Sequence, residues 1–215
     1  PVEIPDPASV DAVVFLLGDG GATEAGRSPT LAALARDVEA WSSALGRDSA
    51  VSVVYPGDIV YPVGVRDRDH PDFETDSVRL WNQIELVAGP ASRAHASLGL
   101  FLAGNHDWGN ARGEAGVRRV ENLARALERA RTTGPKVTLL PGPGEPGPVI
   151  RDLRRNVRLV FVDTHWFLQA RAPREKDAFF EALADALTGA DDRQVIMVQH
   201  HPYRSAGPHD ALRPG

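Results

Sequence analysis

The sequence predicts an α/β domain in which a mostly parallel sheet carries antiparallel additions. Strand-like apolar runs alternate with helix-like stretches up to about residue 140, and hairpin-like strands follow that point. Several apolar runs also end abruptly in Asp, Asn or His. Buried strands of open α/β sheets end in this way when their carboxyl ends carry a site.

The first part of the chain is expected to alternate strands and helices. Continuous β-branched and apolar runs are typical of strands that are buried on both faces. Ser28-Pro29 is typical of a helix N-terminus, and Gly46 is typical of a helix end. A long polar loop over 59–72 is also expected. The expected strands are 10–18, 51–55, 98–103 and 137–140, and the expected helices are 29–45, 73–87 and 114–131.

The last part of the chain is expected to begin with an antiparallel pair, 149–153 and 157–162, joined by a tight polar turn. A helix over 173–187 and a final strand over 194–198 follow. Large apolar side chains at helical spacing are expected to face the core. They include Trp41, Trp81, Phe180, Leu183 and Leu187.

Composition narrows the class of protein. A chain of 215 residues with 42% hydrophobic residues fits one domain over 1–215. Its net charge of −5 argues against a nucleic-acid-binding protein, and the absence of Cys excludes disulfides, thiolate nucleophiles and Cys-ligated metals. No apolar run approaches the roughly 20 residues that span a bilayer. The chain begins at Pro1 and stops at Gly215 in a loop-like stretch, so we expect it to belong to a longer chain.

Four of the apolar runs end in side chains that can bind metal or transfer protons. Carboxyl ends of strands meet at one edge of an α/β sheet, so these side chains should converge although they lie up to about 180 residues apart. Asp, Asn and His together suit Fe, Mn or Zn, and two close carboxylates repel unless a cation neutralises them. Two metals can hold a phosphate ester and generate hydroxide near neutral pH. The candidates are Asp19, Asp58, Asn105, His106, Asp107, His200 and His201.

The order of these polar blocks is informative. They are Gly18-Asp19-Gly20-Gly21, Gly57-Asp58-Ile59-Val60-Tyr61, Gly104-Asn105-His106-Asp107 and His200-His201-Pro202. In order and rough spacing, from Val13 to His209, the set resembles the calcineurin-like metallophosphoesterases. Most of that superfamily has His at the position of Gly21. The combination of Gly21 with Tyr61 resembles the purple acid phosphatase branch.

This resemblance implies a four-layer αββα sandwich of two mixed sheets flanked by helices. It also implies a metal-dependent phosphoric ester hydrolase, an acid phosphatase-like phosphomonoesterase. Asp19 and Tyr61 would bind a first metal, and a Tyr61 phenolate would favour Fe(III). Asp58 would bridge to a second, divalent metal (Fe, Zn or Mn) bound by Asn105 and His200.

The resemblance also implies roles at the substrate. His106 would donate to the phosphate or the leaving group, oriented by the carboxylate of Asp107 or Asp19. His209, nine residues past His200, resembles a further substrate-side proton donor. The expected substrate is a phosphorylated small molecule or a phosphoprotein, and nucleic acid is not expected. An extracytoplasmic or membrane-anchored location is expected from the family, with no membrane span in this stretch.

Some alternatives remain open at this point. The family's final Gly-His-x-His block is not found before Gly215, so five of the seven expected ligands can be placed and the fold is expected to be C-terminally incomplete. A phosphodiesterase on the same fold and a non-catalytic, partner-binding scaffold are therefore kept as alternatives. His200 is favoured over His201 as ligand from the His-x-Pro spacing. His165 and Trp108 either line the site or pack beneath it, and Arg66 and Arg68 are expected to be solvated rather than bound to phosphate.

Overall fold

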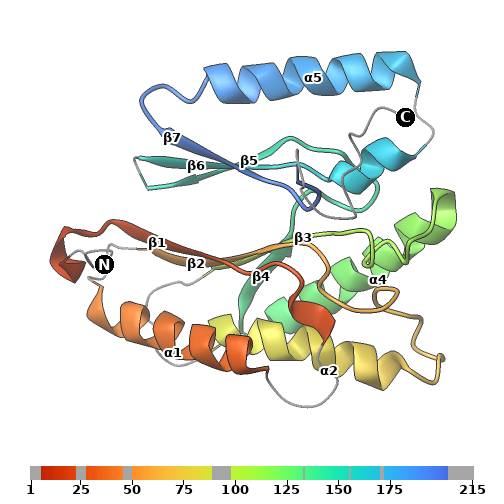
Figure 1. The fold of residues 1–215 in the computed structure, drawn as a ribbon, viewed down its shortest axis with the longest axis horizontal. Helices are drawn as coiled ribbons and strands as arrows, with labels where there is room; N and C mark the ends of the chain where they lie inside the picture. The colour runs from red at the N-terminus through yellow and green to blue at the C-terminus, as the bar shows by residue number, and fades with distance from the viewer. Residues whose placement is uncertain are drawn as a thin grey trace.

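The computed structural model describes residues 6–22, 28–45, 50–88, 98–132, 134–154, 156–169 and 172–202. Two β-sheets lie face to face, and helices cover the outer face of each sheet (Figure 1). The α/β class predicted from the sequence is confirmed. No helix in the described part of the chain is both long and apolar enough to cross a membrane.

The first sheet contains four strands in the order β1-β2-β3-β4. All neighbouring pairs are parallel, so the expectation of two mixed sheets is wrong for this one. Parallel pairing requires a long crossover connection, and each connection between these strands contains an α-helix. The strands are β1 (Ala12–Leu16), β2 (Ala50–Pro56), β3 (Leu98–Leu102) and β4 (Lys136–Leu139).

The helices of this half are close to the predicted ranges. The Ser28 hydroxyl caps α1 by accepting from the Leu31 N–H at 3.2 Å. Figure 1 shows the three α-helices on the same outer face of the first sheet. They are α1 (Pro29–Ala44), α2 (Phe73–Ile84) and α4 (Gly113–Thr132), with short 3₁₀ turns η1 (Pro7–Ser9), η2 (Gly20–Ala22) and η3 (Glu85–Val87). The predicted end of the first helix at Gly46 lies outside the described residues.

The second sheet has the order β5-β6-β7. β5 (Val149–Leu153) and β6 (Val157–Phe161) form the predicted antiparallel pair, and β7 (Gln194–Val198) runs parallel to β6. A 3₁₀ turn that the sequence did not predict, η4 (Thr164–Leu168), follows β6. Helix α5 (Pro173–Thr188) covers the outer face of this sheet (Figure 1).

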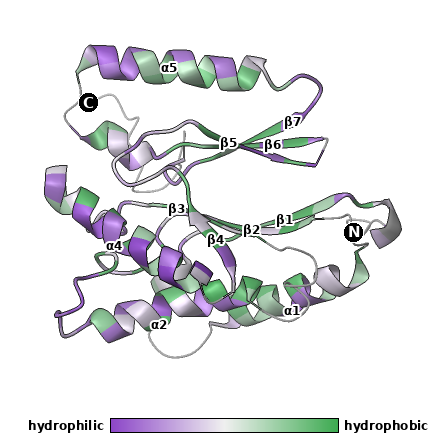
Figure 2. Cartoon of the chain, turned by 180° about the vertical axis from the view of Figure 1, so that it is seen from behind, coloured by the Kyte–Doolittle hydropathy of each residue, from purple (hydrophilic) through white to green (hydrophobic). Residues whose placement is uncertain are grey.

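Alternating side chains divide the core into layers. In β2, Val53 and Tyr55 pack against the helices, whereas Val54 faces the second sheet. In β6, Phe161 faces the first sheet, whereas Val160 packs with α5. Figure 2 shows mostly hydrophobic strands between helices of mixed hydropathy, as expected for strands covered on both faces.

Three side chains that were predicted to face the core are exposed instead. In α5, Phe179 and Ala186 are buried, whereas Phe180 is 57% and Leu187 42% exposed. Adjacent phenylalanines fit either of two helical faces, so the sequence pattern left the rotation of this helix open. Trp81 is also 42% exposed, while Leu80 and Ile84 of the same helix are buried as predicted.

Candidate active site

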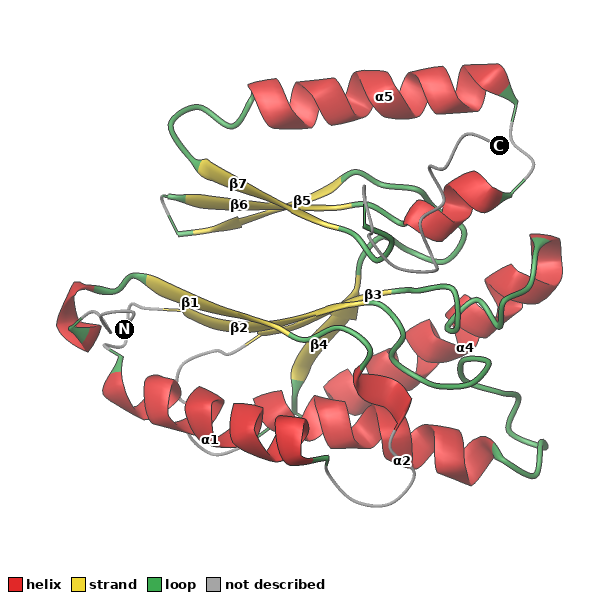
Figure 3. Ribbon diagram, in the orientation of Figure 1, coloured by secondary structure: helices red, strands yellow, loops and turns green. Residues whose placement is uncertain are grey.

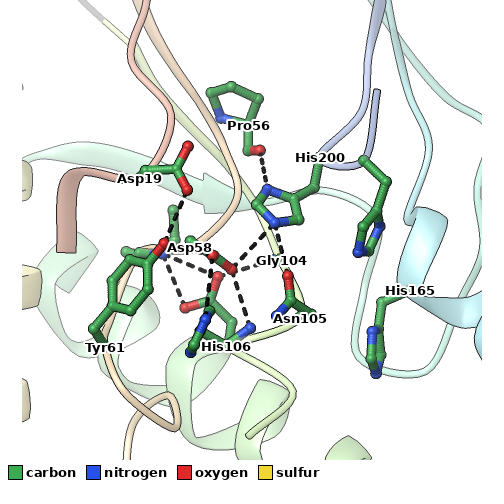
Figure 4. Close-up of polar contacts among 12 residues, drawn as sticks. Asp19, Pro56, Asp58, Tyr61, Gly104, Asn105, His106, His165 and His200 are labelled. Atoms are coloured by element: carbon green, nitrogen blue, oxygen red, sulfur yellow. Dashed lines mark hydrogen bonds and ion pairs between the residues drawn. The ribbon is translucent and has the colours of Figure 1, made fainter. Parts of the chain in front are cut away.

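The predicted candidates gather at one edge of the first sheet. Because β1, β2 and β3 are parallel, the loops that follow them leave the sheet at the same end (Figure 3). The residues after β7 reach the same place from the second sheet. Figure 4 shows the resulting cluster, which contains Asp19, Asp58, Tyr61, Asn105, His106 and His200.

Two of these residues have an unusual backbone. Asp19 has a φ of 57° and Asp58 a φ of 55°, and Gly57 precedes Asp58 with a φ of 100°. Residues other than glycine seldom adopt this left-handed backbone conformation. Where they do, the backbone is strained, and such strained residues are often found at functional sites. The left-handed residues turn the chain just past β1 and β2, where both carboxylates contact the same hydroxyl, that of Tyr61.

Asp58 lies at the centre of the cluster and is 3% exposed. Its Oδ2 accepts the Tyr61 hydroxyl at 2.7 Å, and the same hydroxyl lies 2.9 Å from Oδ1 of Asp19. Its Oδ1 accepts the His106 backbone N–H at 3.0 Å and lies 3.3 Å from Nε2 of His200. One oxygen of Asp58 therefore faces the Asp19–Tyr61 pair, and the other faces His200.

The phenol of Tyr61 is held in its protonated form by these neighbours. Burial, followed by its hydrogen bonds to Asp58 and Asp19, raises the pKa of Tyr61 above its usual value. A phenolate beside two carboxylates would place three negative charges together. Only a cation at this point would make the phenolate favourable.

His200 presents a bare ring nitrogen to the cluster. Its Nδ1 lies 3.0 Å from the Pro56 carbonyl, which can only accept, so Nδ1 carries the proton in the neutral ring. Nε2 then faces two acceptors, Oδ1 of Asn105 at 3.0 Å and Oδ1 of Asp58 at 3.3 Å. Asn105 Nδ2 donates to Asn110 Oδ1 at 2.7 Å, which turns the Asn105 Oδ1 toward His200. Three lone pairs that point together repel one another unless a proton or a cation lies between them.

His106 is held in place by a backbone carbonyl rather than by a carboxylate. Its Nδ1 lies 2.6 Å from the Pro62 carbonyl and therefore donates to it. Its ring stacks at a tilt on Tyr61, with ring centroids 4.2 Å apart, and its Nε2 lies 3.9 Å from Asp58 Oδ2. Asp107 and Asp19 were the expected orienting carboxylates, but the group at Nδ1 of this ring is the Pro62 carbonyl.

Asp107 instead clamps two loops together. Its fully buried carboxylate accepts the backbone N–H groups of Ile59, Val60 and Gly104 at 2.9–3.0 Å. Burial raises the pKa of Asp107 to about 7, although these three N–H groups favour its charged form. The role of Asp107 is to hold the loop after β2 against the loop after β3, so that Asp58 and Asn105 stay side by side.

Glycines allow the loops to approach this closely. A Cβ on Gly21 would lie 2.0 Å from the Ile59 carbonyl oxygen, because the two backbones are docked together there. The Tyr61 N–H donates to the Gly21 carbonyl at 3.2 Å in the same contact. A Cβ on Gly104 would lie 2.3 Å from Asp58 Oδ1. Gly21 and Tyr61, whose combination is informative in the sequence, are therefore neighbours in space. No side chain fits at position 21.

A buried layer lies behind the cluster. Asp163 accepts from Trp108 Nε1 at 2.8 Å and from the His165 N–H at 2.9 Å, and all three side chains are buried. Trp108 and His165 thus pack beneath the site. His201 joins this layer through Thr164, whose Oγ1 lies 2.8 Å from Nδ1. Burial lowers the pKa of His201 to about 4, so its ring is neutral. His200, and not His201, enters the cluster.

Sequence reasoning did not single out Asp163, Pro62 or Asn110. Asp163 carried a usable signal, since it ends the apolar run of β6 just as Asp19 and Asp58 follow theirs. The Pro62 carbonyl carried none, because a backbone oxygen has no residue-type signature. His209 lies outside the described residues.

The donor atoms of the cluster fit a hard or borderline metal ion. Among the described residues, no group of three or more His, Asp or Glu side chains is placed to hold a metal ion. Asp19, Asp58 and His200 of the cluster therefore do not by themselves form such a group. The cluster adds two donors of other kinds, the phenol of Tyr61 and the amide of Asn105. Carboxylate, phenol, amide and imidazole donors suit Fe, Mn or Zn, and the facing lone pairs at His200 Nε2 define where a cation would relieve repulsion.

No protein-family model matches this sequence, and no curated protein sequence matches it. A functional assignment therefore depends on the residues and geometry of the cluster itself.

Proposed function

We propose that this chain is a metal-dependent phosphoric ester hydrolase that resembles the purple acid phosphatase branch of the calcineurin-like metallophosphoesterases. The observation that carries the proposal is the position of Asp58 between two donor groups. One carboxylate oxygen faces Tyr61 and Asp19, and the other faces His200 and Asn105. Such a carboxylate is placed to bridge two cations. The arrangement of two facing sheets with outer helices is compatible with the proposed αββα sandwich.

The same residues divide between two proposed metal positions. Asp19 and Tyr61 would hold Fe(III), Asn105 and His200 would hold a divalent Fe, Zn or Mn ion, and Asp58 would bridge them. Bound there, the two ions would supply Lewis acidity at phosphorus and lower the pKa of water. The Pro56 carbonyl fixes the His200 tautomer that leaves Nε2 free to bind.

His106 is the proposed proton donor. The Pro62 carbonyl holds Nδ1, so Nε2 is the nitrogen that faces the cluster, close to Asp58. A protonated ring would donate from Nε2 to the leaving oxygen of a phosphate ester. Its side chain is 28% exposed, so a substrate can reach it from solvent. The proposed substrate is a phosphomonoester, on a small molecule or a phosphoprotein.

The proposal is tested on the full chain reconstituted with Fe(III) and Zn(II). We expect two bound metals per chain and faster hydrolysis of 4-nitrophenyl phosphate than of bis(4-nitrophenyl) phosphate. Asp58→Asn should lower the rate at least about 100-fold, because it removes a ligand shared by both ions. Asp69→Asn, at an exposed position in the following loop, is the matched control and should keep the wild-type rate.

Other outcomes select the alternatives. A chain that binds two metals tightly and hydrolyses neither ester would overturn the proposal in favour of a scaffold. A preference for the diester would assign a phosphodiesterase instead. The Fe(III) position is tested separately by visible absorption, since a Tyr61 phenolate should give a charge-transfer band that Tyr61→Phe abolishes. Tyr55→Phe, which removes a phenol bound to the Gln83 carbonyl, should keep the band.

A further inference from the structure

A second feature of the molecule lies in the helical layer outside the first sheet. Two hollows of about 300 Å³ and about 270 Å³ lie between α2, α4 and the loop that precedes α2. They share four lining residues, Val65, Arg68, Phe73 and Arg129, and so form one continuous depression. We call it the α2–α4 groove. None of the cluster residues around Asp58 lines it.

One end of the groove is apolar. Its floor is formed by side chains of both helices, and Trp81 stands beside it with 42% of its surface exposed. A large aromatic side chain left half-exposed beside a hollow is a feature of ligand sites, which are usually lined by apolar and aromatic groups. The apolar lining consists of Val65, Phe73, Leu80, Trp81, Ile84, Ala126 and Ala130.

The other end of the groove is basic, because four arginines and one aspartate, Asp67, line it. The Asp67 carboxylate is paired with Arg118 at 3.0 Å. Arg66 is neutralised by Asp76 at 2.8 Å, and Arg125 lies 3.5 Å from Glu121. The guanidinium groups of Arg68 and Arg129 have no hydrogen-bond or ion-pair partner within the part of the chain that the structure describes.

These two free guanidinium groups stand at the junction of the two hollows. Burial, and then the charges of Arg68 and Arg125, lower the pKa of Arg129. Positive charges that repel one another across a hollow favour binding of an anion there.

We propose that the α2–α4 groove binds a small amphipathic anion, an aliphatic or aromatic body that carries a carboxylate or phosphate. The body would occupy the apolar hollow beside Trp81, and the anionic group would lie between Arg68 and Arg129. The first hollow has the volume of a small ligand pocket. The adjoining arginines favour a ligand with a negative charge. This site is separate from the cluster around Asp58 and does not depend on the proposed hydrolase activity.

Isothermal titration with decanoate, 1-decanol and inorganic phosphate tests the groove. Decanoate should bind saturably with one site per chain, whereas decanol and phosphate, each lacking half of the ligand, should bind at least about tenfold more weakly. The double variant Arg68→Gln/Arg129→Gln should weaken decanoate binding at least about tenfold. Arg131→Gln, which removes an exposed arginine of the same helix paired with Glu128, should not change it.

Four results would overturn the proposal. Equal binding of decanol would show an apolar hollow without charge selection. Equal binding of inorganic phosphate would show a simple anion site. Unchanged decanoate affinity in the double variant would place the ligand elsewhere. A chain that fails to bind decanoate but sediments with phosphatidylglycerol vesicles would have a membrane surface there instead. Far-UV circular dichroism of each variant confirms that its fold is intact.

Discussion

At the scale of single residues, the cluster depends on positions where no side chain fits. Gly21 is docked against the backbone of Ile59, and a Cβ there would lie 2.0 Å from a carbonyl oxygen. This contact also holds the backbone of Tyr61. A histidine at position 21 would force the two loops apart, so the absence of a side chain at 21 and the presence of Tyr61 at the site have one structural cause.

Gly21→Ala is therefore expected to destabilise the chain by about 2–3 kcal/mol, since the clash is with backbone that cannot give way. Urea denaturation measures the difference in the free energy of unfolding between the variant and the wild type. Gly18→Ala is the matched control, because its Cβ would lie 3.6 Å from Pro56 Cγ, an ordinary contact. If the two variants were equally stable, the docking of Gly21 against Ile59 would not hold in solution.

A second residue-scale prediction concerns the carboxylate behind the cluster. Burial raises the pKa of Asp163 from 3.8 to about 6, and its hydrogen bond from Trp108 only partly offsets this. The folded state then binds more protons than the unfolded state, so the cost of charging Asp163 is absent below about pH 4 and complete above about pH 6. Stability should fall by about 3 kcal/mol as the pH rises through this window.

Urea denaturation from pH 4 to pH 7 tests the sign. Asp163→Asn does not titrate, so its stability should fall less with pH than that of the wild type. It should be less stable at pH 4, because an NH2 group replaces one of the two oxygens that accept from Trp108 Nε1 and from the His165 N–H. If the free energy of unfolding of the two proteins changed with pH in parallel, the pKa of Asp163 would not be raised in the folded state.

At the scale of elements, α2 serves as the support of the loop that carries Tyr61. Gln83 donates to the Ile59 carbonyl at 2.7 Å, Arg79 donates to the Tyr61 carbonyl, and Asp76 accepts from Arg66. Long loops without regular structure need such anchors to hold a site. The polar residues on the inner face of α2 thus tie the loop to the helix, while its apolar residues tie the helix to the sheet.

Asp76→Ala should release the end of this loop. The carboxylate is fully buried and Arg66 nearly so. Its loss leaves Arg66 with only the exposed carboxylate of Asp72, at 3.6 Å, and should cost about 3 kcal/mol. The matched control is Asp69→Ala, at an exposed position in the same loop. Hydrogen exchange of the Val65 and Arg66 amides should also accelerate in Asp76→Ala alone, and unchanged exchange would contradict the anchoring role.

The strands and helices also show which features sequence patterns can predict and which they cannot. Strand and helix ranges were predictable because burial on both faces and capping residues leave strong local signals, as at Ser28-Pro29. The convergence of Asp19, Asp58 and Asn105 followed from strand ends alone. The rotation of α5 was not predictable, because Phe179 and Phe180 are equally apolar. The support of His106 by Pro62 was not predictable either, because it depends on a backbone oxygen brought close by the fold.

At the scale of the whole molecule, the cluster joins the two sheets. Asp58 and Asn105 follow strands of the first sheet, whereas His200 follows β7 of the second, and their contacts at 3.0–3.3 Å cross from one sheet to the other. A cation bound among these three side chains would replace a repulsive contact with shared ligands. Metal binding should therefore stabilise the packing of one sheet on the other.

Thermal unfolding tests this last prediction independently of activity. Zn(II) at 100 times its dissociation constant should stabilise the metal-free chain by about 2.7 kcal/mol, which raises the Tm, and EDTA should reverse the effect. Amide exchange at Val198 and Gln199, just before His200, should slow on Zn(II) addition. Asp58→Asn should show neither change, whereas Asp69→Asn should show both. Stabilisation that persists in Asp58→Asn would place the metal elsewhere, and a Tm that does not respond in any protein would mean that the sheets are joined without a cation.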